Sequence, residues 1–234
     1  MYEKCRGING FKINRRMIES LLKNIIYFIF NKYRVREWTY NKIYFYYFIF
    51  INNIKYSYSV ENIINFSTKD KIIKKYINSR GLQHSPLLKT KKLLKEISNK
   101  KDYHFIDIGS GLGVLLIYVL INHNFKGYEG IELNKKFFKD SLKNLKKNKH
   151  KNKKLVTIKN ISAEKIILDK NKRYAIYLYN PFKELVLYKF LQKNHKNIKK
   201  NQSIILYVSN KKEIVFEKFN LKKKNISHDL TIYS

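Results

Sequence analysis

Hydrophobic and polar positions alternate through the last two thirds of the chain in a pattern that predicts strands and helices in regular succession. Short apolar runs between polar residues predict strands, and apolar residues spaced three or four positions apart predict helices. The predicted strands are 103–108, 127–132, 155–160, 174–179 and 203–209. The predicted helices are 112–122, 134–148 and 183–198, with a short one near 163–167. This alternation predicts an α/β fold, a Rossmann-like, doubly wound, mainly parallel sheet with an antiparallel edge strand formed by the tail at 226–234.

The first third of the chain is dominated by aromatic and basic residues. Apolar runs occupy 25–30 (IIYFIF) and 43–51 (IYFYYFIFI), and 42–51 fits a helix or a strand. Neither run reaches the roughly 20 residues that a membrane-spanning helix needs, and no signal-peptide cleavage site follows the first run. We therefore predict an N-terminal, mainly helical extension at 1–79 that acts as a cap or lid. The alternative is an anchor formed by residues 21–51 that lies at a membrane surface.

A turn at 80–86 opens the second part, which we predict to be one domain over residues 80–234. Gly81 and Pro86 punctuate this turn. Ser85 is expected to cap a helix that has Pro86 at its first position and runs to Ile97.

The most informative segment is the turn after the first strand of this domain, which reads D-I-G-S-G-L-G. Gly109, Gly111 and Gly113 permit tight backbone angles and let a ligand approach the main chain. The helix that follows offers free N–H groups at its start. A dinucleotide site prefers G-x-G-x-x-G, but here the third glycine comes one position early and Val114 takes the sixth position. The spacing therefore disfavours a nicotinamide enzyme.

Two acids flank this loop in the sequence. Asp107 stands two residues before the first glycine, and Glu132 ends the second strand, 19 residues after Gly113. A carboxylate at 107 repels a pyrophosphate and suits a cationic ligand such as S-adenosylmethionine (SAM). A carboxylate at 132 is placed to take both hydroxyls of a ribose.

Together these features resemble the class I SAM-dependent methyltransferases, over about residues 80–234. The glycine loop matches the first motif of that family, and Glu132 in G-I-E-L-N matches the second. The third motif usually has an acid beside the adenine, whereas this chain has Ser162 there, with the Ala163 backbone as a further contact. The resemblance implies SAM as the cofactor. The residues that it implies for cofactor binding are Asp107, Gly109, Ser110, Gly111, Gly113, Glu132, Ser162 and Ala163.

The fourth motif is 177-YLYNPF-182. It resembles the strand end of small bacterial "YNPF"-type methyltransferases and, more loosely, the N-P-P-[YF] of amine methyltransferases. The resemblance implies a catalytic site at Asn180, Pro181 and Phe182, in which the Asn180 amide orients an amine. Because the sulfonium of SAM is already activated, the protein mainly has to hold the acceptor in line with the methyl group. The alternative is that N-P-F forms only a strand-to-helix turn.

Composition adds a strong positive charge, with 50 Lys+Arg against 17 Asp+Glu and a net charge of +33. Such a field attracts nucleic acid or an anionic membrane surface, so weak, non-specific contact with either is a further expectation. The basic residues are spread along the chain and most are Lys, which together with Asn, Ile, Tyr and Phe has A/T-rich codons. Genomic base bias therefore accounts for part of the charge. The single cysteine, Cys5, favours a reducing cytoplasm, and the six histidines show no spacing that predicts a metal site.

The leading hypothesis is a SAM-dependent methyltransferase that modifies an unidentified acceptor, either a protein amine such as lysine or RNA. The alternative is a non-catalytic Rossmann module that binds SAM or nucleic acid, which the serine at 162 suggests. The pattern does not identify the acceptor or the oligomeric state.

Overall fold

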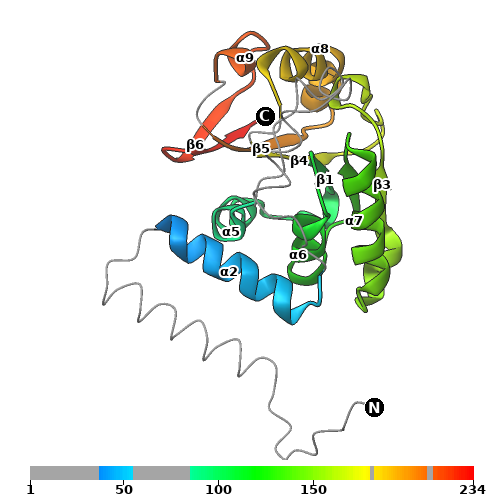
Figure 1. Ribbon diagram of the computed structural model, residues 1–234. Helices are drawn as coiled ribbons and strands as arrows, with labels where there is room; N and C mark the ends of the chain where they lie inside the picture. Colours follow the sequence, from blue (N-terminus) through cyan, green and yellow to red (C-terminus); the bar gives the residue numbers. More distant parts are fainter. Residues whose placement is uncertain (1–36, 55–84, 180–181, 210–212) are drawn as a thin grey trace, which may run out of the picture. The chain divides into compact units, whose positions relative to one another are not determined.

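A seven-stranded sheet forms the centre of residues 44–234 (Figure 1). The computed structural model describes residues 37–54, 85–179, 182–209 and 213–234. The chain divides into two units, Met1–Ile43 and Tyr44–Ser234. The strands are β1 His104–Ile108, β2 Gly127–Ile131, β3 Val156–Lys159, β4 Tyr174–Tyr179, β5 Ile204–Val208, β6 Lys223–Ser227 and β7 Leu230–Tyr233.

The strand order is β3-β2-β1-β4-β5-β7-β6. Strands β1 to β5 pair in parallel, and β7 pairs antiparallel with both β5 and β6. This confirms the Rossmann-like, mainly parallel sheet. The chain leaves β1 toward β2 on one side and later returns to β4 on the other, so the order reverses between β1 and β4. Ligands of such sheets bind at this reversal, outside the carboxyl ends of the strands.

The tail differs from its prediction in one respect. It forms a hairpin of β6 and β7 rather than one edge strand, and β7 lies inside the sheet between β5 and β6. The apolar residues of β7 are all buried, whereas four of the five residues of β6 are exposed. The exposed strand therefore takes the edge.

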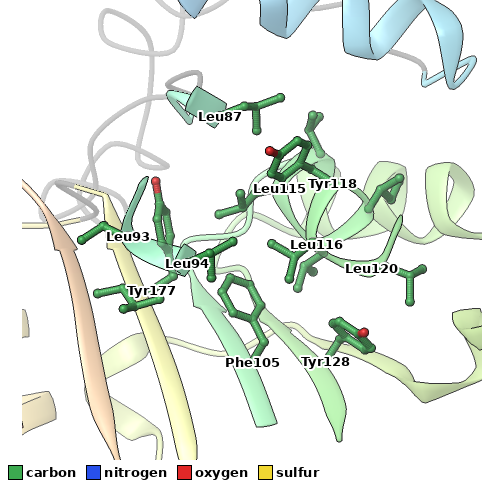
Figure 2. Packing of buried hydrophobic residues seen from close by; sticks show 14 of the residues in the cluster. Leu87, Leu93, Leu94, Phe105, Leu115, Leu116, Tyr118, Leu120, Tyr128 and Tyr177 are labelled. Carbon is green, nitrogen blue, oxygen red and sulfur yellow. The ribbon is translucent and has the colours of Figure 1, made fainter. Parts of the chain in front are cut away.

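Helices cover both faces of the sheet. Their bounds are α2 Glu37–Ile51, α5 Leu87–Lys95, α6 Val114–Asn122, α7 Lys135–Lys147, α8 Glu184–Lys200 and α9 Glu213–Glu217, with short 3-10 turns η1 Lys100–Asp102, η2 Lys151–Leu155 and η3 Ala163–Lys165. On one face, leucines of α5 and α6 pack over Phe105 and Tyr128 (Figure 2). On the other face, α8, α9 and η3 cover Ile106, Ile176 and their neighbours.

The aromatic run at 43–51 forms the second half of α2, so it is a helix and not a strand. Within residues 44–234, Phe45, Phe48, Ile49 and Ile54 are buried in the first of these clusters. The Phe48 ring meets the Tyr118 ring edge-on at 5.3 Å between centroids. These residues therefore belong to the core. The predicted boundary at residue 80 lies outside the described residues and stays a prediction, as do the lid and the surface anchor.

No helix of the described ranges is long and apolar enough to cross a membrane. The helix after the turn at 80–86 begins one residue later than predicted, because Pro86, and not Ser85, is the N-cap of α5. The Pro86 carbonyl accepts the Thr90 amide at 2.9 Å, which is the first bond of the helix.

Asn194, on the buried face of α8, ties this helix to the segment between η3 and β4. Its Nδ2 donates to the Ile166 and Phe190 carbonyls at 2.9 and 2.8 Å, and its Oδ1 accepts the Leu168 amide at 2.8 Å. The side chain is fully buried. A buried amide or carbonyl that loses its partner keeps its desolvation cost, so the bonds of Asn194 are hard to replace.

We expect Asn194→Ala to lower the free energy of unfolding by about 2–4 kcal/mol, because the Leu168 amide and the Ile166 carbonyl lose their partner. Asn201→Ala is the matched control, since Asn201 donates to the Lys170 and Lys172 carbonyls at 2.8 and 3.0 Å near the surface. Water replaces that donor, so the control should lose less than about 1 kcal/mol. Denaturant unfolding of both variants measures the difference, and equal losses would contradict a special role for Asn194.

Candidate functional site

The loop between β1 and α6 depends on its three glycines. Gly109, Gly111 and Gly113 have φ values of 92°, 53° and 74°. All three lie in the left-handed region, where a side chain is strained. Gly113 is also the N-cap of α6. The sequence predicted tight backbone angles at these glycines, and all three have a positive φ.

Backbone bonds tie this loop to the end of β2. The amides of Gly109 and Ser110 both donate to the Ile131 carbonyl, at 2.8 and 2.9 Å. The Gly111 amide donates to Glu132 Oε2 at 2.8 Å. The glycine loop and Glu132, which the sequence singled out, are thus brought together at the carboxyl ends of neighbouring strands.

The Glu132 carboxylate binds a second amide with its other oxygen. Oε1 accepts the Asn134 amide at 2.7 Å, where α7 begins. Burial raises the pKa of Glu132, and the hydrogen bonds from the Asn134, Gly111 and Leu133 amides oppose that rise. Each carboxylate oxygen has two lone pairs, so both oxygens can still accept a ligand hydroxyl.

Asp107 lies beside Glu132 without a partner of opposite charge. Its side chain is buried at the end of β1, and this burial, with the nearby Glu132 carboxylate, raises the pKa of Asp107 to about 8. Within the described part of the chain, no hydrogen bond or ion pair reaches its carboxylate. The site therefore holds two buried carboxyl groups, and among the described residues no cationic side chain contributes to the pKa of either.

Two asparagines that sequence reasoning missed hold the loop and β2 in place. Asn144, on the buried face of α7, donates to the Leu112 carbonyl at 3.1 Å. Asn160, just after β3, donates to the Glu132 and Leu133 carbonyls at 2.8 and 3.0 Å. Asn144 could have been found from the sequence, because its helical spacing from Phe137 and Ser141 places this polar residue on the buried face of the helix.

Tyr177 is a further neighbour of Asp107 that the sequence did not single out. The two residues pair across β1 and β4, and the Tyr177 ring rises between Leu93 and Leu94 of α5 (Figure 2). Its hydroxyl lies 2.9 Å from Thr90 Oγ1. Burial raises the pKa of Tyr177, so the hydroxyl stays neutral. This hydrogen bond ties α5 to β4, the strand beside the one that carries Asp107.

The other predicted site residues lie as follows. Ser110 is buried, and its Oγ has no hydrogen-bond partner in the described ranges. Ser162 is the N-cap of η3, which begins at Ala163, and among the described residues neither of them is hydrogen-bonded to Glu132. Phe182 is buried in the cluster under α8, on the opposite face from Tyr177. Asn180 and Pro181 lie outside the described residues, and the described ranges hold no group of three or more His, Cys, Asp or Glu placed for a metal ion.

Comparisons with known proteins give structural similarity alone. No protein-family model matches the chain, and no curated protein matches it. Among solved structures, the fold is similar to precorrin-6y C5,15-methyltransferase from Geobacter metallireducens, with 15% identity, a TM-score of 0.48 and coverage of 65% of this chain and 90% of that one. It is also similar to a SAM-dependent methyltransferase from Aquifex aeolicus, with 17% identity, a TM-score of 0.46 and coverage of 61% and 87%.

A third similar structure is the ribosomal protein L11 methylase from Lactobacillus delbrueckii subspecies bulgaricus, with 11% identity, a TM-score of 0.47 and coverage of 65% and 79%. Because these TM-scores lie below 0.5, the function of this chain has to be argued from its own residues.

Asp107→Asn is expected to raise the melting temperature, and to raise it more at about pH 8.5 than at about pH 5.5. An acid whose pKa rises from 3.8 to about 8 on folding binds more protons in the native state. Native stability therefore falls as the pH increases from about 4 to about 8, and the asparagine removes that loss. Thermal melts at both pH values check this, and an unchanged or lower melting temperature at both would show that Asp107 is ionised and compensated.

Proposed function

We propose that this protein binds SAM at the carboxyl ends of β1 and β2 and transfers its methyl group to an acceptor, either a protein amine or RNA. The observation that carries the proposal is the pair of buried acids, Asp107 and Glu132, beside a loop of three left-handed glycines. The loop lies where the strand order reverses, which is the usual ligand position in such sheets.

The charge of the site favours SAM over a dinucleotide. SAM carries a positive ammonium and a positive sulfonium, and a cation beside Asp107 would remove the cost of its ionisation. A pyrophosphate at the same loop would gain nothing from Asp107, which has no basic side chain bonded to it in the described ranges. Together with the early third glycine, this favours SAM over a nicotinamide dinucleotide.

Each site residue has a distinct task in this proposal. Glu132 uses its remaining lone pairs to accept the ribose hydroxyls while it keeps its bond to Gly111. Asp107 neutralises the cationic end of the ligand. The glycine loop lets the ligand approach the main chain, and Ser162 and Ala163, which follow β3 at the same edge of the sheet, contact the adenine.

SAM supplies a methyl group that is already activated, so the chain's own residues have to orient the acceptor and exclude water. Asn180 follows β4, the strand beside β1, and in the proposal its amide orients an acceptor amine. The buried Phe182 anchors the segment after β4 under α8. The Y-N-P-F segment also supports placing the chain with the small bacterial methyltransferases that share it.

A non-catalytic SAM-binding module is the second candidate, and Ser162 is the observation that favours it. An acid is usual at this position in the family that the sequence resembles. The next acid, Glu164, is engaged by Lys189 at 3.5 Å. Binding of SAM without methyl transfer to any acceptor would identify this second function.

Glu132→Gln should weaken binding of S-adenosylhomocysteine by about 1.5–3 kcal/mol, the usual worth of a hydrogen bond to a charged group. Glu129→Gln is the matched control, because Glu129 lies on β2, which Glu132 directly follows, and both residues are 8% exposed. Glu129 faces Tyr174, Lys159 and Lys172 on the α8 side of the sheet, so its loss should change the affinity by less than about 2-fold. Calorimetric titration measures both affinities, and melting temperatures show that both variants are folded. Equal affinity of wild type and Glu132→Gln would remove this loop from the cofactor site.

Asn180→Ala should reduce methyl transfer about 100-fold and leave SAM affinity nearly unchanged, because an acceptor that is misplaced reacts slowly. The measurement follows labelled methyl from SAM into protein or RNA of a cell extract. A purely structural Asn180 would instead lower the melting temperature and cofactor affinity together. Wild-type turnover in the variant would show that Asn180 has no part in catalysis.

A further inference from the structure

One stretch of the chain has a much higher density of positive charge than the rest. Residues 135–159 contain eleven lysines and a single acid, Asp140, which makes a net charge of +10 in 25 residues. The remaining 209 residues carry +23. A base-composition bias acts on the whole gene and gives no reason for such a local excess.

The fold places the lysines of α7 on one side of that helix. Ser141 and Asn144 are buried, and Phe137 and Leu145 pack against the core. The six lysines of α7 are all exposed, and at 3.6 residues per turn they fall within a band roughly 120° wide and about 18 Å long. These six are Lys135, Lys136, Lys139, Lys143, Lys146 and Lys147.

The turn η2 extends this surface beyond the end of α7. Lys153 Nζ donates to the Lys146 carbonyl at 3.4 Å, so η2 lies against the last turn of the helix. The exposed lysines of this extension are Lys149, Lys151, Lys153 and Lys154. Figure 1 shows α7 beside β3 at the edge of the sheet, away from α8 and α9. We call the lysines of α7 and this extension the α7 basic surface.

Elsewhere on the described surface, several exposed lysines form ion pairs with acids. Lys189 of α8 pairs with Glu164, Lys223 pairs with Glu213, and Lys224 pairs with Glu96, at 3.5, 2.6 and 2.8 Å. The α7 basic surface has Asp140 alone as an acid in its stretch of sequence, and Asp140 lies 3.1 Å from Lys143. Lysines therefore greatly outnumber acids in this stretch of the sequence.

The α7 basic surface begins at the candidate cofactor site. Lys135 is the first residue of α7, directly after Asn134, whose amide donates to Glu132. A polyanion that lies along α7 is thus led to the carboxyl ends of β1 and β2. This arrangement suits an acceptor that is itself a polyanion.

We propose that the α7 basic surface docks the phosphate backbone of double-stranded RNA and presents this RNA for methylation. The role in methylation rests on the proposed function; the docking does not. Lysines suit backbone phosphates as point charges. Phe137 and Phe138 are half-buried, so the surface lacks exposed rings on which unpaired bases stack, which favours a duplex. A lysine-bearing protein segment would meet repulsion from this surface.

The test compares two triple variants of the full-length protein that remove equal charge. Lys139→Gln/Lys146→Gln/Lys147→Gln alters the α7 basic surface, and Lys196→Gln/Lys199→Gln/Lys200→Gln alters α8 on the opposite face of the sheet. Each triple variant removes the two lysines in the last turn of its helix, so the effect on the helix dipole is matched. Anisotropy of a short labelled RNA duplex gives the affinity across about 50–200 mM KCl.

We expect the α7 variant to bind the duplex at least about 10-fold more weakly than wild type at about 150 mM KCl. The slope of log affinity against log salt concentration should become shallower by about 3, since each phosphate contact contributes about 1. The α8 variant should stay within about 2-fold of wild type. Equal weakening in the two variants, or no binding by wild type at this salt concentration, would overturn the proposal. Tighter binding of a DNA duplex of the same sequence would overturn the assignment to RNA.

Vesicles of phosphatidylserine and phosphatidylcholine test the membrane as the partner. A loss of vesicle binding in the α7 variant with unchanged RNA binding would replace RNA by a membrane surface. S-adenosylhomocysteine titrations separate the two proposals, because both variants should keep wild-type cofactor affinity. Cofactor binding without RNA binding refutes only the docking surface, whereas RNA binding without cofactor binding refutes only the proposed function.

Discussion

One carboxylate, that of Glu132, joins the parts of the candidate site, since it binds the amides of two different segments. Gly111 donates to one oxygen from the glycine loop, and Asn134 donates to the other from the start of α7. Three left-handed glycines give the loop little stiffness of its own. Its shape therefore depends on Glu132 and on the Ile131 carbonyl, which holds two further amides. The acid is needed for the architecture before any ligand is bound.

The candidate site and the helix that follows it carry ionisable groups of opposite kinds. Asp107 and Glu132 are buried acids at the carboxyl ends of the strands, whereas α7, which starts beside them, exposes six lysines. In the proposals above, the interior pair accepts a small cation and the exterior helix accepts a polyanion. The cofactor and the acceptor are thus attracted by groups of opposite charge, which gives each of them a docking position of its own.

The sequence located the parallel strands to within one residue at each end, because each is an apolar run with polar residues on both sides. It missed β6, whose exposed residues show no apolar alternation. The contact between Gly111 and Glu132 joins residues 21 apart and depends on the register of β1 and β2, which a linear pattern does not contain. Phe182 was expected beside an acceptor, yet it is buried with Val186 and Phe190, which follow it by four and eight residues in the sequence. Its part in catalysis, like that of Asn180, stays a prediction.

The sheet order also bears on self-association. Strands β3 and β6 are the two edges, and an open edge offers unpaired amides and carbonyls to the strand of another chain. Both edges carry exposed lysines, Lys159 on β3 and Lys223 and Lys224 on β6, and the pairing of β6 shifts register between Asn225 and Ser227. Charged side chains and an irregular register both make an edge strand a poor partner for the strand of another chain. The lysines that give this protein its charge thus also protect an open sheet from aggregation by edge-to-edge pairing.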